Sequence, residues 1–185
     1  MKNLQSIIQE KLRLGKDTKV DIYNYHPKTR KELRNILEKR LKTDKNANLN
    51  DIDVSNITDM GPDSINQGLF EGLDPHNIDI SEWNVSNVKN MQYMFYDCTN
   101  FNSDLSDWDV SNVTDMGAMF AGCENFNADL SSWDVSNVTN MNGMFNGCKN
   151  FNSDLSKWDV SNVTNMANIF NNSPLENNPP KWYKL

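Results

Sequence analysis

A single 25-residue period dominates this chain and restricts what it can fold into. Tryptophan, valine, methionine and phenylalanine each recur at this interval. The four sets are Trp83, Trp108, Trp133 and Trp158; Val85, Val110, Val135 and Val160; Met91, Met116, Met141 and Met166; and Phe95, Phe120, Phe145 and Phe170. A fixed period of this length is typical of repeat proteins, in which each repeat packs mainly against its neighbours. We therefore expect a stack of turns that share one apolar interior.

One copy, residues 130–154, contains two different hydrophobic spacings. Trp133 and Val135 alternate with polar residues, which predicts a short strand with one inward face. Methionine, phenylalanine and cysteine then follow at helical spacing over 141–148 and predict a short helix. The expected fold class is an α/β repeat solenoid, with short parallel strands along one side and short helices along the other.

The same copy resembles a known repeat. The phrase L-x-x-W-D-V-S-N-V-T-x-M-x-x-M-F-x-G-C-x-x-F-N-x-D is similar to the repeat of BspA-like leucine-rich-repeat surface proteins and, more distantly, to the treponemal type of leucine-rich repeat. The resemblance implies an open, leucine-rich-repeat-like solenoid that serves in binding, often in adhesion, without catalytic activity. Such repeats also resemble those in proteins of gut bacteria and their phages.

Residues 1–48 lack the repeat. Apolar spacing predicts a helix over 4–12 and alternation predicts a strand over 19–25. Thr29 and Glu32 form a capping box before a second predicted helix. We expect this helix–strand–helix unit to act as an N-terminal cap, because an open solenoid otherwise exposes the apolar interior of its first turn.

Residues 49–173 form the expected solenoid of about five turns. The first turn, residues 49–79, is irregular, because it matches the later copies only if extra residues bulge out at 61–66. Three prolines in residues 174–185 forbid another regular turn, so we expect this segment to cover the last turn as a C-terminal lid. The side chains expected to do so are Leu175, Trp182 and Tyr183.

The net charge of −7 hides a division between the two parts of the chain. Residues 1–48 contain 13 Lys+Arg and 6 Asp+Glu, a balance of +7, whereas residues 49–185 contain 5 and 19, a balance of −14. An acidic repeat body disfavours nucleic acid, so only the N-terminal segment is suited to a phosphate backbone. A basic face for nucleic acid or another anionic partner is thus the alternative to a plain cap. Its candidate residues are Lys28, Arg30, Lys31, Arg34, Lys39, Arg40 and Lys42.

Cysteine and tryptophan columns are interpreted as core. Cys98, Cys123 and Cys148 occupy one phase of successive turns without a histidine beside them, which favours buried, reduced thiols over a zinc site. The tryptophans could form a stacking platform for sugars or bases. Their phase, shared with a valine two residues later, favours an inward position, where each indole N–H needs a carbonyl, Asn or Ser partner.

Polar columns follow the same period. Asn87, Asn112, Asn137 and Asn162 are expected to form a buried ladder along the stack, with N-glycosylation at the N-x-T sites as the alternative. Two aspartate columns are expected to cap backbone N–H groups at the corners, with bridging calcium as the alternative. They are Asp79, Asp104, Asp129 and Asp154, and Asp109, Asp134 and Asp159.

Nothing in the sequence predicts an enzyme, a cofactor or a metal site. The two histidines, His26 and His76, have no nucleophile or carboxylate constellation around them, and no glycine-rich phosphate loop is present. Variation between copies is the better indicator of function. The copies differ at residues 92–93 and 96–97 and at the equivalent positions of the later turns. They also differ at the positions that flank each tryptophan. The flanking positions are our candidates for partner binding: Glu82, Asn84, Asp107, Asp109, Ser132, Asp134, Lys157 and Asp159.

We expect a non-catalytic protein–protein interaction module that presents an acidic solenoid face, with a protein partner that the sequence does not identify. A structural component of a larger assembly, such as a phage particle, is one alternative. A cell-surface adhesin that lacks its export signal is another. No signal peptide or membrane span is visible in the sequence, which favours a cytoplasmic or virion-associated location over secretion.

Overall fold

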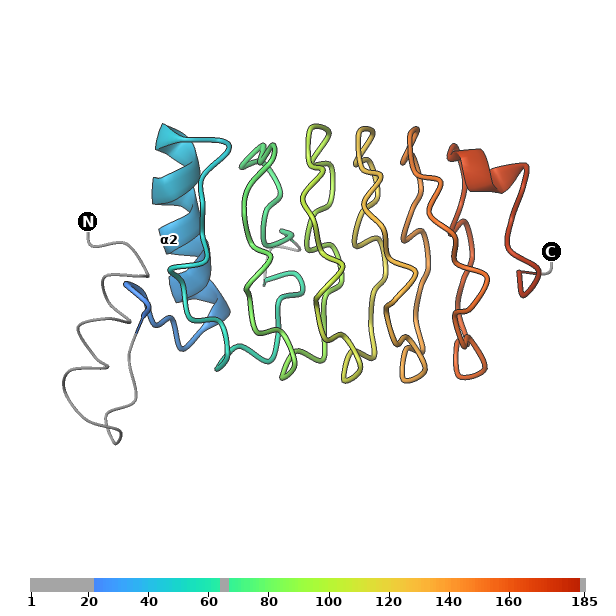
Figure 1. Cartoon of the computed structure of the whole chain (residues 1–185), viewed down its shortest axis with the longest axis horizontal. Coiled ribbons are helices and arrows are strands. Elements are labelled where there is room, and N and C mark those ends of the chain that lie inside the picture. Colours follow the sequence, from blue (N-terminus) through green and yellow to red (C-terminus); the bar gives the residue numbers. More distant parts are fainter. Residues whose placement is uncertain (1–21, 64–66, 184–185) are drawn as a thin grey trace, which may run out of the picture.

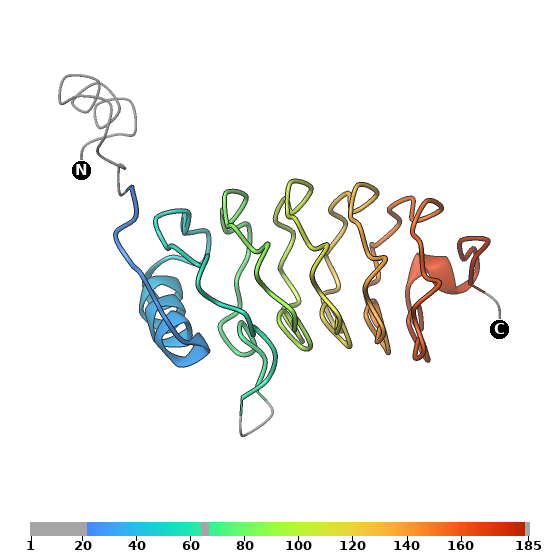
Figure 2. The same cartoon turned by 90° about the horizontal axis from the view of Figure 1, so that it is seen from below.

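Successive turns of the chain lie side by side in a row, with a helix at one end and the C-terminal segment at the other (Figure 1). The structure, a computed structural model, describes residues 22–63 and 67–183. The view turned by 90° shows the same row, with the helix and the C-terminal segment again at opposite ends (Figure 2). We propose that this row is an open repeat solenoid. The helix predicted over 4–12 and residues 64–66 of the predicted bulge lie outside the described residues.

The helix at the N-terminal end of the row, α2, spans Arg30–Thr43. The Thr29 side chain accepts a hydrogen bond from the backbone N–H of Glu32 at 3.2 Å, which confirms the predicted cap. The Glu32 carboxylate in turn accepts from the backbone N–H of Lys28 at 2.7 Å, one residue before the cap. The side chains that the helix buries in the common core include Leu33, Leu37 and Leu41.

The segment before α2 contacts the first turn through a short parallel pairing. Of the strand predicted over 19–25, the structure describes residues 22–25, in which Tyr25 forms a parallel bridge with Ile52. The backbone N–H of Asp53 donates to the carbonyl oxygen of Tyr25 at 2.8 Å. The pairing attaches this segment to the end of the row that α2 covers.

Columns of aromatic rings run through the interior of the row. Neighbouring rings of the first phenylalanine column, from Phe70 to Phe170 in steps of 25 residues, have centroid separations of 4.8, 5.6, 5.8 and 6.1 Å. A second column joins Phe101, Phe126 and Phe151 at 5.7 and 5.6 Å. Trp83 and Trp108 stack at 6.3 Å with an interplanar angle of 5°. The prediction that equivalent aromatic rings meet across neighbouring turns is confirmed for the phenylalanine columns and for this tryptophan pair.

Backbone hydrogen bonds between turns follow the segment from methionine to cysteine, where we predicted helices. The N–H groups of Met91, Tyr93 and Phe95 donate to carbonyl oxygens one turn ahead, each at 2.9 Å. Within the described residues the helices are α2 and the short η1, so the helices predicted in the turns are absent. Each copy instead makes successive tight turns, because two positions adopt a positive φ that an α-helix excludes, as at Gly143 (63°) and Gly147 (76°).

Among the described residues, the segment from tryptophan to valine, where we predicted strands, is connected to neighbouring turns by side chains and not by backbone hydrogen bonds. Its backbone bonds are local, as from the N–H of Val113 to the carbonyl oxygen of Val110 at 2.9 Å. Side chains connect the turns here, as where the indole N–H of Trp108 donates to the carbonyl oxygen of Ile80 at 3.0 Å. The predicted inward position of the tryptophans is confirmed, because all four are 4 % exposed. In the described structure, parallel bridges between turns run instead through a column from Asp59 to Asn165.

The C-terminal segment packs against the last turn, as predicted for residues 174–183. It begins with η1, Pro174–Glu176, which buries Leu175. The ring of Tyr183 lies edge-on to Phe170 at 5.3 Å. The cover is partial, because the last members of three apolar columns are only half-buried, whereas the preceding members are buried. They are Val160, Val163 and Met166.

Candidate interaction surface

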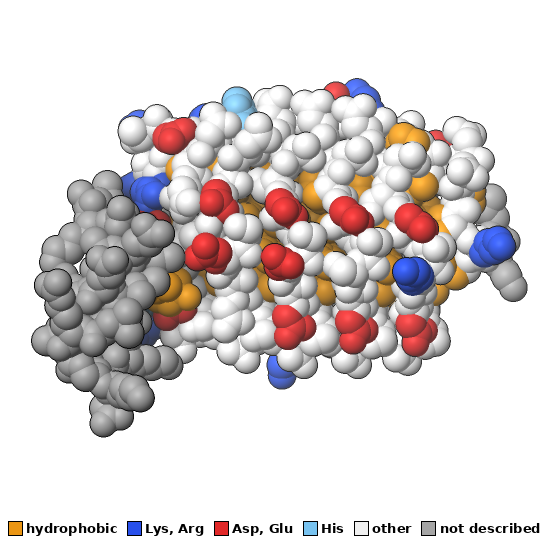
Figure 3. All heavy atoms as spheres, in the orientation of Figure 1, with side chains coloured by type: hydrophobic (Ala, Val, Ile, Leu, Met, Phe, Trp, Pro, Cys, Tyr) orange, Lys and Arg blue, Asp and Glu red, His pale blue; other side chains and the backbone are white. Residues whose placement is uncertain are grey.

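The tryptophan-to-valine segments present rows of carboxylates on one side of the molecule (Figure 3). All eight predicted partner-binding positions, from Glu82 to Asp159, are exposed. We define the acidic face by its carboxylates, which are Asp79, Glu82, Asp104, Asp107, Asp109, Asp129, Asp134, Asp154 and Asp159. Lys157 is the cation among the predicted positions. The face is therefore strongly negative and repeats at the spacing of the turns.

The column aspartates of this face cap the backbone, as predicted. Oδ1 of Asp104 accepts the backbone N–H of Ser106 at 3.0 Å and its hydroxyl at 2.7 Å. Oδ1 of Asp109 accepts the same two groups of Ser111 at 3.1 and 2.6 Å. The backbone bond recurs at Asp53, Asp79, Asp129, Asp134, Asp154 and Asp159. Each of these carboxylates is thus held in one orientation by a local turn.

These bonds also favour the ionised carboxylate. Donation from the backbone N–H and hydroxyl of Ser106 lowers the pKa of Asp104, while the like charge of Asp129 opposes this shift. Donation from the hydroxyl and backbone N–H of Ser136 lowers the pKa of Asp134 in the same way. Asp104 and Asp134 are consequently ionised at neutral pH.

Metal-binding chemistry is not supported by the arrangement of these groups. Within residues 22–63 and 67–183, no three His, Cys, Asp or Glu side chains are grouped so that they could hold a metal ion. The cysteines are buried, as predicted, and the thiol of Cys148 donates to the carbonyl oxygen of Phe120 at 3.0 Å. Burial raises the pKa of the Cys148 thiol to about 12, so it is protonated at neutral pH.

The asparagine ladder forms, but not in the interior. The side-chain amides of Asn112 and Asn137 donate to the carbonyl oxygens of Ser86 and Ser111, each at 2.8 Å. These asparagines are exposed, which corrects the prediction of a buried ladder. The amides bond one turn back along the surface, where a short polar side chain reaches a corner carbonyl without entering the core.

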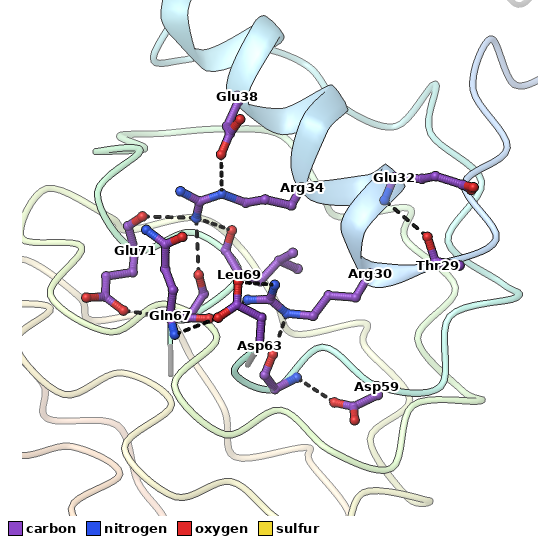
Figure 4. A network of polar contacts seen from close by, with 12 residues as sticks. Thr29, Arg30, Glu32, Arg34, Glu38, Asp59, Asp63, Gln67, Leu69 and Glu71 are labelled. Carbon is purple, nitrogen blue, oxygen red and sulfur yellow. Dashed lines mark hydrogen bonds and ion pairs between the residues drawn. The ribbon is translucent and has the colours of Figure 1, made fainter. Parts of the chain in front are cut away.

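The predicted basic face divides into two groups. Arg34 is 8 % exposed and donates from Nη1 to the carbonyl oxygens of Gly68, Leu69 and Glu71 at 3.1, 2.8 and 2.9 Å (Figure 4). Arg30 donates to the carbonyl oxygens of Gly61 and Gln67. Each guanidinium supplies several N–H donors, and in the described structure the carbonyl oxygens that they bind beside the bulge do not accept backbone bonds from other turns. These two arginines therefore attach α2 to the first turn.

Arg40 also contacts the first turn, through Asp51 at 2.9 Å, and its guanidinium lies over the ring of Tyr25 in the segment before α2. The remaining members of the predicted set are exposed. They are Lys28, Lys31, Lys39 and Lys42. Three of the seven predicted residues therefore hold the cap in place and are not available to a partner. The sequence did contain a signal for this structural role. Arg30 and Arg34 lie one helical turn apart and beside the buried leucines, so they share the inward side of the helix.

A second surface feature is a pocket beside the methionine-to-cysteine segment of the second turn. A pocket of about 450 Å³ is lined by Pro62, Glu71, Gln92, Tyr93 and Tyr96. The sequence singled out three of its residues, Gln92, Tyr93 and Tyr96, only as positions that vary. Nothing in the period indicated that the irregular first turn would complete a pocket beside them.

The family model described as a Mycoplasma protein of unknown function, DUF285, matches residues 31–120 and 63–182. The chain belongs to this family. The two matches overlap, as expected for a repeated sequence, and together extend from the start of α2 to the C-terminal segment, so the matched region includes this helix as well as the turns. Curated proteins and solved structures gave no match. In the described part of the chain, no helix is long and apolar enough to cross a membrane.

Proposed function

We propose that this chain is a non-catalytic interaction module that binds a basic protein surface through the acidic face. The observation on which this rests is the fixed geometry of its carboxylates. Hydrogen bonds from serine N–H and hydroxyl groups orient the column aspartates. Because the turns are equal in length, equivalent aspartates lie in rows along the molecule. Rows of ionised groups in set positions complement a cationic surface and accelerate its association.

The other ionisable groups support a non-catalytic role. The cysteine thiols are buried and protonated, so they are poor nucleophiles. Each histidine has one carboxylate beside it, which corrects the expectation from the sequence: His26 lies 3.4 Å from Asp53, and His76 lies 3.3 Å from Asp74. The Ser55 hydroxyl donates to the Asp53 carboxylate at 2.6 Å, whereas the serine of a Ser-His-Asp triad is bonded to the histidine. The BspA-like repeat motif, which implies binding without catalysis, is consistent with this proposal.

Charge neutralisation that preserves the turns provides a direct test. The triple variant Asp109→Asn, Asp134→Asn, Asp159→Asn removes three charges but retains an oxygen that accepts the serine N–H. Asn84 already does this, since its Oδ1 accepts from Ser86 at 3.2 Å. Wild-type and variant proteins are immobilised and exposed to lysate of the source cells at low salt. We expect proteins that the wild type retains to be lost from the variant and to be released from the wild type by salt.

A matched control neutralises three carboxylates outside the acidic face. Asp97→Asn, Glu124→Gln and Glu176→Gln change the net charge equally, and we expect this protein to retain the same proteins as the wild type. Equal retention by the triple variant of the acidic face would contradict the proposal, and equal loss in both variants would show a net-charge effect only.

A second candidate is a structural role within a larger assembly. It is favoured by the half-buried state of Val160, Val163 and Met166 at the C-terminal end of the row. A further protein surface there would complete the burial that all preceding turns have. Replacing Val163 by Glu should then prevent the chain from entering an assembly reconstituted from source-cell components, without affecting capture by the acidic face. An assembly that incorporates this variant normally would speak against the structural role.

A further inference from the structure

The second turn breaks the symmetry of the repeat on its methionine-to-cysteine side. Two tyrosines stand there, Tyr93 and Tyr96, and the latter is among the few exposed large hydrophobic residues at 38 % exposure. The equivalent positions of the third turn are Ala118 and Ala121. These positions differ in every turn, but the second turn is the one that places aromatic side chains at both, and the other turns stack without them.

The backbone at Tyr93 is unfavourable for a tyrosine. Its φ of 56° lies in the left-handed region, and the equivalent position of the fourth turn is Gly143 with φ 63°. A residue with a Cβ is strained in this conformation. Ala118 and Asn168 adopt the same conformation with φ of 51° and 57°, so the large aromatic side chain, and not the backbone, distinguishes the second turn.

Both rings contribute to the pocket of about 450 Å³, a size within the usual range for small-molecule sites. Their centroids are 5.3 Å apart and their planes meet at 68°, so two differently oriented aromatic surfaces line the same space. Pro62 and Glu71 come from the first turn. The Glu71 carboxylate is fixed, because its Oε2 accepts the backbone N–H of Gly68 at 2.9 Å.

We propose that this pocket binds a neutral sugar. Aromatic faces match the C–H face of a pyranose ring, and tyrosine adds a polar hydroxyl to that apolar surface. The amide of Gln92 and the carboxylate of Glu71 supply donors and acceptors, which suits hydroxyl groups that both donate and accept. The negative charges of Glu71 and the neighbouring Asp97 disfavour phosphates and acidic sugars.

Titration with three neutral disaccharides, maltose, cellobiose and lactose, tests the site by chemical-shift changes in the full-length protein. We expect saturable binding of at least one of them at millimolar concentrations. Tyr96→Ala should weaken that binding at least about tenfold, as removal of one stacking ring does at other aromatic sites. Tyr93→Gly should weaken sugar binding similarly. The melting temperature of this variant should equal or exceed that of the wild type, because glycine relieves the strained backbone.

Asn168→Gly is the matched control, since Asn168 has φ 57° at the same position of the fifth turn. It should leave sugar binding unchanged. A proline-rich peptide, which aromatic surfaces also bind, forms the competing arm of the titration. The proposal is overturned if no disaccharide gives a saturable shift, if only the peptide binds, or if Tyr93→Gly binds sugar as the wild type does.

Discussion

The indole N–H of Trp182 donates a hydrogen bond to the carbonyl oxygen of Leu155 at 2.7 Å. Trp158 makes the same bond to Leu130, one turn earlier, at 3.0 Å. Trp182 follows Trp158 by 24 residues, not 25, and comes after a run without the repeat motif. The C-terminal segment therefore adds one more indole donor to the series of tryptophan–carbonyl bonds and terminates the row with a partner that its last turn needs.

Trp182→Phe tests this bond. Phenylalanine keeps most of the packing against Phe170 but removes the indole donor, so that the Leu155 carbonyl keeps only its bond from the backbone N–H of Trp158 at 3.1 Å. We expect the free energy of unfolding to fall by about 1 kcal/mol, as for loss of one part-buried hydrogen bond. Chemical denaturation measures the change, with Lys181→Ala, an exposed neighbour, as the control. Equal stability of both variants would show that the indole N–H contributes nothing.

Arg34 should be essential to the attachment of α2. Arg34→Met keeps the length of the side chain but removes its donors to three carbonyl oxygens. We expect a loss of about 3 kcal/mol, since buried acceptors lose their partners together. Lys31→Ala, an exposed change on the same helix, should alter stability by less than about 0.5 kcal/mol. Limited proteolysis should cut α2 faster in Arg34→Met; wild-type protection would contradict the proposed attachment.

The three cysteines should be unreactive until the protein unfolds. Burial raises the pKa of Cys123 well above its usual value, and Cys98 and Cys148 lie in the same column. Iodoacetamide at mildly alkaline pH should therefore label none of them in the native protein. After unfolding without reductant, mass spectrometry should show three adducts. Native labelling would place a thiol at the surface, and fewer than three adducts after unfolding would indicate a disulfide.

Acid should destabilise the acidic face through its serine-capped aspartates. The pKa values of Asp104 and Asp134 are lowered in the folded state. A lowered folded pKa gives stability that is present above the unfolded value of about 3.9 and is lost as pH falls through the folded value. Asp104→Asn with Asp134→Asn keeps the acceptor oxygens but does not titrate. Its melting temperature should fall less than that of the wild type between about pH 6 and about pH 3; parallel curves would refute this.

The repeat period was enough to predict the interior. Residues spaced by a whole period occupy the same position in every turn, so the phase shared by Trp133 and Val135 fixed their common inward side. The acidic face followed from the same phase, because the positions that flank an inward tryptophan must point outward. This argument needs no knowledge of the backbone conformation.

Backbone conformation was harder to predict. The spacing of Met141, Phe145 and Cys148 fits one face of a helix, but it equally fits successive tight turns with the same inward residues. Gly143 and Gly147 distinguished the two, since their positive φ values are incompatible with a helix. The bond from Trp182 was not visible because its spacing differs from the period. The spacing of Arg34 beside the buried leucines indicated that it faces the core, but the carbonyls that it binds were not predictable because they lie in the irregular first turn.

Removal of one complete turn tests most directly whether the turns share one continuous interior. Deletion of residues 105–129 joins Asp104 to Leu130 in register, so that Trp83 should stack on Trp133. Denaturation followed by tryptophan fluorescence and circular dichroism should give one coincident transition, at a lower denaturant concentration than for the wild type. Two separate transitions, or a protein that fails to fold, would contradict a row of equivalent turns with a common core.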